Sequence, residues 1–260
     1  MEEYNKKRDY KPVQSIERIF QVLEILAVNP EGLSLAALSE KTGLPGSTLH
    51  RLLHTLYALG YTEWRYSNSA PYKLTLRLFE YGNALVEHRP FIQMAHPVLD
   101  RLAEEVDLSA YIFFPEVPDM ICTISSTRPS FLNWPHRGSR VPMWCSAAGK
   151  CFLSSQSTLD LEELWKNRGA SFYGPNAPAS VNELRRDLAA IQKKGYALSR
   201  EELRVGLASM SVPLIDQNGV TFGALSVYGT LSQFAEGKEQ FFAEKLKQYG
   251  RALTSHPTNC

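Results

Sequence analysis

The stretch SLAALSEKTGLPGSTLHRLLHTLYALGY, residues 34–61, decides the fold of the first part of the chain. Its apolar residues predict two short helices, and Gly43 and Pro45 predict the tight turn that joins them. In the second helix, leucines recur at i, i+3, i+4 and i+7, which is the pattern of a helix with one buried face. These leucines are Leu49, Leu52, Leu53 and Leu56.

The opposite face of the second helix is polar. It carries Ser47, His50, Arg51 and His54, with Thr48 at the first turn. Small hydroxylated residues let a helix N-terminus approach a phosphate, where free N–H groups favour an anion. We therefore interpret the stretch as a helix-turn-helix whose second helix enters the major groove of double-stranded DNA. The alternative is an ordinary helical hairpin in a core.

The charge distribution agrees with DNA binding in this region. The chain has 260 residues, 44% of them hydrophobic, and a net charge of +1, which allows two domains and excludes a basic protein overall. Residues 41–79 nevertheless contain five basic residues and one acidic residue, a net charge of +4. Basic charge is thus concentrated around the proposed reading helix, as phosphate binding requires.

The flanking segments complete a winged module. Ser15 is the expected N-cap of a first amphipathic helix that ends before Asn29 and Pro30. Alternating residues after Gly60 and a turn cluster at 67–71 predict a β-hairpin of the size of a wing. Arg65 and Asn68 at its tip could contact DNA, or the tip could be an exposed loop. The N-terminal arm, residues 1–12, holds four basic residues and is expected to be a solvated tail unless DNA orders it.

The rest of the chain predicts a linker and an α+β sensor. We assign residues 1–73 to the winged helix-turn-helix with its arm, 74–89 to a linker helix and 90–260 to an effector-binding domain. Candidate strands span 110–114, 120–126, 207–215 and 220–228, and the dipeptide Asn218-Gly219 predicts a hairpin between the last two. Helices are expected after Ser146, Thr158 and Ser180 and over 238–253.

Motifs for catalysis are weak. The segment around Gly149 and Lys150 lacks the first glycine and the magnesium-binding hydroxyl of a phosphate loop. Ser146 and Lys150 have the wrong spacing for a serine-lysine acylation motif, and Cys145 with His136 is only a pair in sequence. The four cysteines, the last of them Cys260, show no metal-ligand spacing. We expect no catalytic residues, no metal, no cofactor and no enzyme activity.

What remains in the second part is a candidate small-molecule pocket rather than a reaction. Phe131, Trp134 and Trp144 offer apolar surfaces near the small residues Ala147 and Ala148. The N-terminus of the helix after Ser146 could hold the carboxylate of a small organic acid. The alternative is that these aromatic residues simply fill a core.

Several blocks, in order, make the chain resemble the isocitrate lyase regulator (IclR) family of bacterial transcription factors. The first part matches in SIERIFQVLEIL, GLSLAALSEKTGLPGSTLHRLLHTLYALGY and YKLTLRLFEYG. The second part matches in GSRVPMWCSAAGK, KKGYALSREELRVGLASMSVPLIDQNG and FGALSVYG. The resemblance implies a winged helix-turn-helix, a linker helix and a profilin-like or GAF-like effector domain. It also implies a homodimer or a dimer of dimers.

The resemblance also implies roles for individual residues. Ser47, Thr48, His50 and Arg51 match the family's reading helix, although Gly46 stands where relatives often have a lysine. Effector-contacting positions fall on Ala147, Ala148, Ser199, Ser209, Ser226 and Tyr228, with residues 131–134 as a lid. Asn133, Met143 and Leu225, in the same loop and blocks, complete the expected set. Ser199 replaces an aspartate of some relatives, which lessens repulsion of an anion, and Tyr228 replaces a smaller residue, which narrows the cavity.

These observations predict a repressor or activator that controls a catabolic operon and whose operator binding responds to a small organic acid, aromatic acids included. A cytoplasmic protein with reduced thiols is expected, because no signal segment or membrane span is evident. Two alternatives stay open. One is a redox sensor that uses Cys122, Cys145 or Cys151, and the other is an enzyme acting on a small acid with Cys145 or Cys151 as nucleophile.

Overall fold

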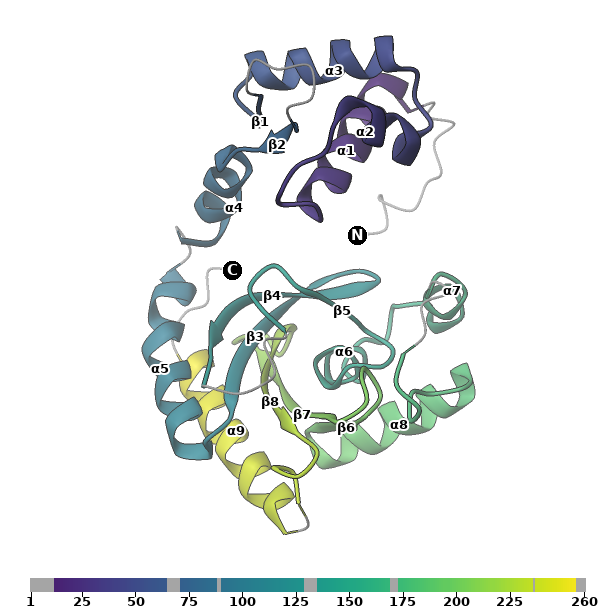
Figure 1. Cartoon of the computed structure of the whole chain (residues 1–260). Helices are drawn as coiled ribbons and strands as arrows, with labels where there is room; N and C mark the ends of the chain where they lie inside the picture. The colour runs from purple at the N-terminus through teal and green to yellow at the C-terminus, as the bar shows by residue number, and fades with distance from the viewer. Residues whose placement is uncertain are drawn as a thin grey trace. The chain divides into compact units, whose positions relative to one another are not determined.

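The chain divides into two compact units, residues 1–85 and 86–260 (Figure 1). The computed structural model describes residues 12–64, 71–87, 90–128, 135–168, 173–235 and 237–255. The segment expected to be the linker, 74–89, lies across this division. Each unit has its own hydrophobic core, so each is described by itself.

The first unit is a winged helix-turn-helix. Its elements are α1 (Gln14–Ala27), α2 (Leu35–Thr42), α3 (Gly46–Ala58), β1 (Thr62–Glu63), β2 (Lys73–Leu74) and α4 (Arg77–Glu87). Strands β1 and β2 are antiparallel, with Thr62 opposite Leu74. Ser34 caps α2 by accepting a hydrogen bond from the backbone N–H of Ala37. The expected cap of α1 is wrong, because the helix begins at Gln14 after an uncapped Val13.

The turn between α2 and α3 is held by local hydrogen bonds. Gly43 ends α2 with φ +67°, a left-handed conformation that glycine adopts without strain. The Ser39 hydroxyl donates to the Leu44 carbonyl at 2.6 Å. Leu49, Leu53 and Leu56 on α3 are buried against α1 and α2, as their spacing predicts. The short turn and this packing fix which side of α3 faces solvent.

The second unit is built on a six-stranded antiparallel sheet with the order β5-β4-β3-β8-β7-β6. Its strands are β3 (Ser109–Glu116), β4 (Asp119–Ser126), β5 (Arg140–Pro142), β6 (Ala197–Arg200), β7 (Leu207–Ile215) and β8 (Thr221–Thr230). Its helices are α5 (Pro90–Val106), α6 (Ala147–Leu153), α7 (Leu161–Lys166), α8 (Val181–Lys194) and α9 (Lys238–Thr254). The α+β class is therefore confirmed, whereas β5 and β6 are too short to have been expected.

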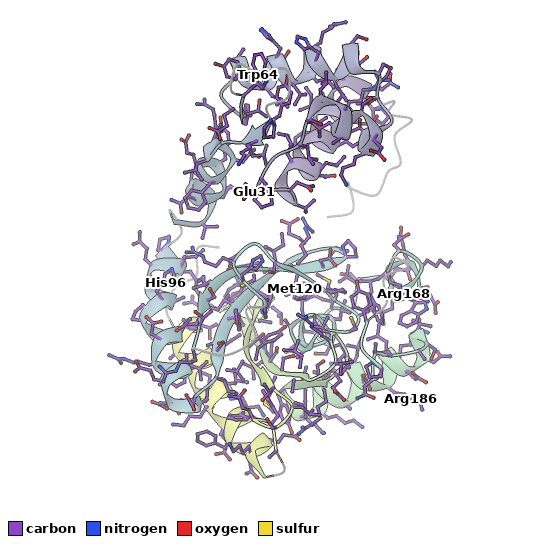
Figure 2. All side chains as sticks on the ribbon, in the orientation of Figure 1. Glu31, Trp64, His96, Met120, Arg168 and Arg186 are labelled. Carbon is purple, nitrogen blue, oxygen red and sulfur yellow. The ribbon has the colours of Figure 1, made fainter. Side chains whose placement is uncertain are left out.

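Helices cover both faces of this sheet (Figure 1). Helices α5 and α9 pack on one face, against side chains such as Ile112, Met210 and Leu225. Helices α6 and α8 cover the other face, which we call the inner surface, together with α7. Figure 2 places Met120 in the interior, and its side chain is fully buried in the core of the inner surface. The two-residue period of each strand decides which side chains face α6.

Candidate functional sites: an exposed polar helix face and a buried polar surface

The solvent-facing side of α3 presents the residues expected to read DNA. Ser47, His50, Arg51 and His54 are exposed, and Thr48 is half-buried. The rings of His50 and His54, one helical turn apart, are stacked with centroids 6.5 Å apart. Arg65 and Asn68, expected at the wing tip, lie outside the described residues. The helix thus offers donors and a positive charge on one side and leucines on the other.

The inner surface of the second unit carries most of the residues expected to bind an effector. Ser199, Ser209, Ser226 and Tyr228 all point to this face, since their strand neighbours pack against α5 and α9. All four are buried. Residues of β6, β7 and β8 far apart in the sequence are thereby brought together under α6.

One expected residue is misplaced. Leu225 is fully buried among the residues that pack against α5 and α9, on the opposite face from Ser226. Adjacent residues of a strand point to opposite faces, so Leu225 cannot share a cavity with Ser226 and Tyr228. We therefore remove Leu225 from the candidate site.

Helix α6 and the segment before it cover the inner surface. Met143, Trp144, Ala147 and Ala148 are buried here. Gly149 lets α6 lie close to the backbone of Met143, because an added Cβ would lie 2.2 Å from the Cα of Met143. Phe131, Asn133 and Trp134, the expected lid, lie outside the described residues.

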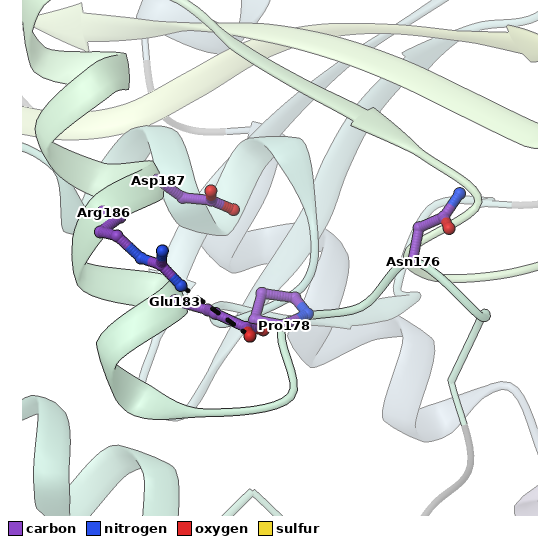
Figure 3. Close-up of a pocket in the computed structure, with 5 residues that line it drawn as sticks. All are labelled: Asn176, Pro178, Glu183, Arg186 and Asp187. Atoms are coloured by element: carbon purple, nitrogen blue, oxygen red, sulfur yellow. Dashed lines mark ion pairs between the residues drawn. The ribbon is translucent and has the colours of Figure 1, made fainter.

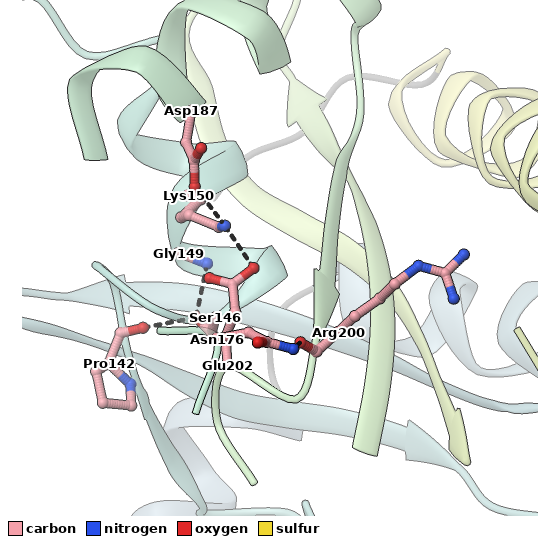
Figure 4. A network of polar contacts seen from close by, with 8 residues as sticks. All are labelled: Pro142, Ser146, Gly149, Lys150, Asn176, Asp187, Arg200 and Glu202. Carbon is pink, nitrogen blue, oxygen red and sulfur yellow. Dashed lines mark hydrogen bonds and ion pairs between the residues drawn. The ribbon is translucent and has the colours of Figure 1, made fainter. Parts of the chain in front are cut away.

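The N-terminus of α6 is partly satisfied within the protein. The Ser146 hydroxyl donates to the Pro142 carbonyl at 2.6 Å and accepts from the Gly149 N–H at 3.0 Å (Figure 4). The helix is only seven residues long. Both facts weaken this terminus as a site for an anion.

Buried hydroxyl groups line the surface below α6. The Oγ atoms of Ser211 and Ser226 lie 2.7 Å apart on neighbouring strands. The Tyr228 ring packs edge-on against Tyr111, with centroids 5.2 Å apart, and lies near Phe113. Burial raises the pKa of the Tyr228 phenol. The phenol therefore stays protonated and can both donate and accept.

Two polar atoms of the expected effector residues have no partner. The Tyr228 hydroxyl and the Trp144 indole N–H are buried and make no hydrogen bond within the described part of the chain. Trp144 is fixed by edge-on contacts with Trp165 and Tyr173, with centroids 5.3 and 5.0 Å away. A buried polar group without a partner costs about 1 to 3 kcal/mol, which a ligand could recover by pairing with it.

A buried ion network, not anticipated from the sequence, lies at the other end of α6. The Lys150 ammonium donates to Glu202 Oε1 at 2.6 Å and to Asp187 Oδ2 at 3.0 Å (Figure 4). Lys150 and Glu202 are almost fully buried. Burial raises the pKa of Glu202 to about 7, against the opposing effect of Lys150. The one sign of this network in the sequence is a lysine within the otherwise apolar segment AAGKCFL. Its partners Asp187 and Glu202 are 37 and 52 residues away along the chain, so the sequence did not identify them.

Two polar cavities beside α8 are separate from the expected effector residues. One, of about 370 Å³, is lined by residues 176, 178, 183, 186 and 187 and is edged by the Glu183–Arg186 ion pair (Figure 3). The other, of about 310 Å³, contains Lys150, Glu202, Tyr196 and Glu239. The Tyr196 hydroxyl donates to Glu239 at 2.7 Å. No residue expected to bind the effector is among the described residues that line either cavity.

The described thiols are poorly suited to redox or nucleophilic chemistry. Cys122, Cys145 and Cys151 are fully buried. Burial raises the pKa of Cys122 to about 12 and raises the pKa values of Cys145 and Cys151 as well. His136 is exposed, with its Nδ1 3.0 Å from the Arg137 carbonyl, whereas Cys145 is buried. Burial disfavours the thiolate form of these thiols, and both alternatives require a thiolate.

A winged helix-turn-helix and a separate α+β unit in one chain define the class of two-domain DNA-binding regulators. Two family models match the chain, the IclR helix-turn-helix domain over residues 15–65 and the bacterial transcriptional regulator IclR C-terminal domain over 83–255. The chain belongs to the IclR family of DNA-binding transcriptional regulators. None of the described helices is both long and apolar enough to cross a membrane.

Individual relatives agree with this assignment. The transcriptional repressor IclR of Escherichia coli (strain K12) is 27% identical over 93% of this chain and 89% of its own length. A putative regulator from Rhodococcus sp. RHA1 has a TM-score of 0.78 at 20% identity, covering 94% and 98% of the two chains. An IclR homologue from Microbacterium hydrocarbonoxydans, solved with 4-hydroxybenzoate, has a TM-score of 0.76 at 20% identity, covering 93% and 98%. These homologues are described as transcriptional regulators.

Proposed function

We propose that this regulator binds a small organic acid, aromatic acids included, on the inner surface of its second unit and that the acid changes its affinity for an operator beside catabolic genes. The observation that carries the proposal is the pair of unpartnered buried groups, the Tyr228 hydroxyl and the Trp144 indole N–H. A cavity lined by apolar surface with a few convergent polar groups is typical of small-molecule sites. The Microbacterium homologue, which binds an aromatic hydroxy acid, supports the same class of ligand.

On the DNA side, we propose that the exposed face of α3 contacts base edges and phosphates. Arg51 supplies the charge, and Ser47 and Thr48 lie at the helix N-terminus, where N–H groups favour a phosphate. His50 and His54 add donors on the same face. Arg65 and Asn68 remain proposed contacts of the wing.

Two half-sites in one operator require two copies of α3 in fixed relation, roughly 34 Å apart for one turn of duplex. We propose that the apolar side of α4 binds a second copy of the chain. Leu78, Phe79, Tyr81 and Leu85 are 39, 66, 50 and 69% exposed. An apolar stripe of this kind on a surface marks an interaction site. Sedimentation of the Phe79→Asp variant tests this, with a shift toward monomer expected and an unchanged mass contradicting it.

The effector can act only by binding one arrangement of such a dimer more tightly than another. We would enrich operator duplexes from a randomised library and measure binding of the full chain by fluorescence anisotropy at fixed salt. Addition of a broad panel of carboxylic acids should identify one that changes the Kd by about 5- to 150-fold, the usual range of coupling between sites. If no acid changes the Kd, the proposed effector response is wrong.

A further inference from the structure

A row of buried side chains with hydroxyl groups crosses the inner surface and ends near an arginine. The sheet register places Ser199 opposite Ser209, Ser209 opposite Tyr228, and Tyr228 opposite Ser109. All four are buried. The backbone N–H of Arg128 donates to the Ser109 hydroxyl at 3.1 Å. The backbone of Arg128 therefore lies at the β3 end of this row, although Arg128 lies outside the sequence blocks that suggested the effector site.

The guanidinium of Arg128 is incompletely paired. Its Nε is buried and has no hydrogen-bond partner among the described residues. Its Nη2 is 3.7 Å from Asp107 Oδ1, which is too long for a hydrogen bond, and the side chains of Arg128 and Asp107 are 40 and 84% exposed. A buried N–H of a cation without an acceptor is costly, and a carboxylate matches the planar guanidinium with two parallel bonds.

Two other basic side chains of the second unit, Lys150 and Arg137, already have hydrogen-bond partners. Lys150 is held by Glu202 and Asp187. Arg137 is exposed, and its Nε donates to the Thr123 carbonyl at 3.1 Å. Of the basic side chains that the structure describes here, Arg128 is the one with a buried donor still lacking an acceptor.

We propose that Arg128 binds the carboxylate of the effector and so makes the site select acids. The carboxylate lies at the β3 end of the row, beside Ser109, and the body of the ligand extends toward Tyr228. A ligand with a second hydrogen-bonding group would satisfy the Tyr228 hydroxyl as well. This inference rests on the proposed function and deepens it, because it names the charged group that distinguishes an acid from its neutral analogue.

The test compares acids with their amides on the full chain. Isothermal titration would measure the Kd of a broad panel that includes benzoate and 4-hydroxybenzoate, each beside the corresponding amide. The variants are Arg128→Gln, Arg128→Lys, the control Arg137→Gln, and Asp107→Asn. Asparagine tolerates the positive φ of +51° at residue 107, so the last variant removes only the charge that competes for Arg128. Circular dichroism would establish that each variant is folded.

We expect the wild type to bind an acid more tightly than its amide. Arg128→Gln should raise the Kd for the acid roughly 10- to 100-fold, the effect of one charge-assisted hydrogen-bonded pair. The Kd for the amide should be nearly unchanged. Arg128→Lys should restore part of the loss, and Asp107→Asn should strengthen acid binding about two- to fivefold, as for an exposed ion pair. If Arg128→Gln binds the acid as tightly as the wild type, or if Arg137→Gln is the variant that loses acid affinity, the role of Arg128 is overturned. The proposal that the effector is an acid would still stand. A wild type that binds no acid, or binds amides equally well, overturns both.

Discussion

The hydroxyl oxygens of Ser211 and Ser226 are 2.7 Å apart between β7 and β8, on the buried inner surface of the second unit. Replacing Ser226 with leucine puts a branched side chain on the inner surface, where we propose that the acid binds. We predict that Ser226→Leu abolishes the response of operator binding to an acid and leaves DNA affinity without acid unchanged, since Ser226 lies in a different unit from α3. Anisotropy titrations with and without the acid measure both quantities.

Ser226→Ala is the matched control. It removes one hydrogen bond and adds no bulk, so it should reduce stability by about 1 kcal/mol and retain the response to the acid. The cavity assignment is contradicted if Ser226→Leu and wild type are stabilised equally by the same acids in a thermal shift assay.

Arg51 is predicted to contact the operator. Its side chain is exposed on α3, beside His50 and His54. Arg51→Ala should weaken operator binding by about 1 to 3 kcal/mol, the range of one good base or phosphate contact. Arg251→Ala, an exposed arginine on α9, removes the same charge elsewhere and should change binding little. Equal Kd values for wild type and Arg51→Ala at fixed salt would exclude the contact.

The network around Lys150 makes a stability prediction. Above the Glu202 pKa of about 7, Lys150→Met leaves a buried carboxylate without its counter-charge and should destabilise the second unit by about 3 to 5 kcal/mol. The double variant Lys150→Met/Glu202→Gln removes both charges and should recover most of this loss. Denaturant unfolding followed by tryptophan fluorescence measures these differences, with Arg186→Met, whose side chain is 78% exposed, as control. A double variant no more stable than Lys150→Met would contradict an electrostatic origin.

Glu202 should give the stability a specific dependence on pH. Burial raises its pKa from 4.5 to about 7, so the folded protein holds this proton more tightly than the unfolded chain. The corresponding stabilisation is complete below pH 4.5 and is lost as the pH rises through 7. Between these limits the wild type should lose up to about 3 kcal/mol relative to Glu202→Gln. If the free energies of unfolding of the two proteins change in parallel from pH 5 to 8, the pKa of Glu202 is not raised and this prediction is wrong.

The sequence was most informative where structure is local. The spacing of Leu49, Leu53 and Leu56 correctly predicted the buried side of α3, and Asn218-Gly219 correctly predicted the turn between β7 and β8. Thr158 was a wrong helix start, because the side chain of Asp160 accepts from two N–H groups at the beginning of α7.

The interior of the second unit was less accessible from sequence. The pairing of Lys150 with Glu202, and the place of Arg128 beside Ser109, depend on packing between distant segments. No short-range pattern encodes such pairings. Leu225 is a different case, since the alternation of a strand already places it on the opposite face from Ser226. The period of the strand, applied strictly, would have excluded it.

The central claim is that an acid bound on the inner surface changes DNA binding by α3. The most direct measurement is the salt-dependent Kd of the full chain for its enriched operator, with and without the acid that stabilises it most. We predict a Kd that rises steeply with salt, as phosphate contacts require, and that changes at least fivefold with the acid in wild type but not in Ser226→Leu. A Kd that depends on neither salt nor acid would contradict the account.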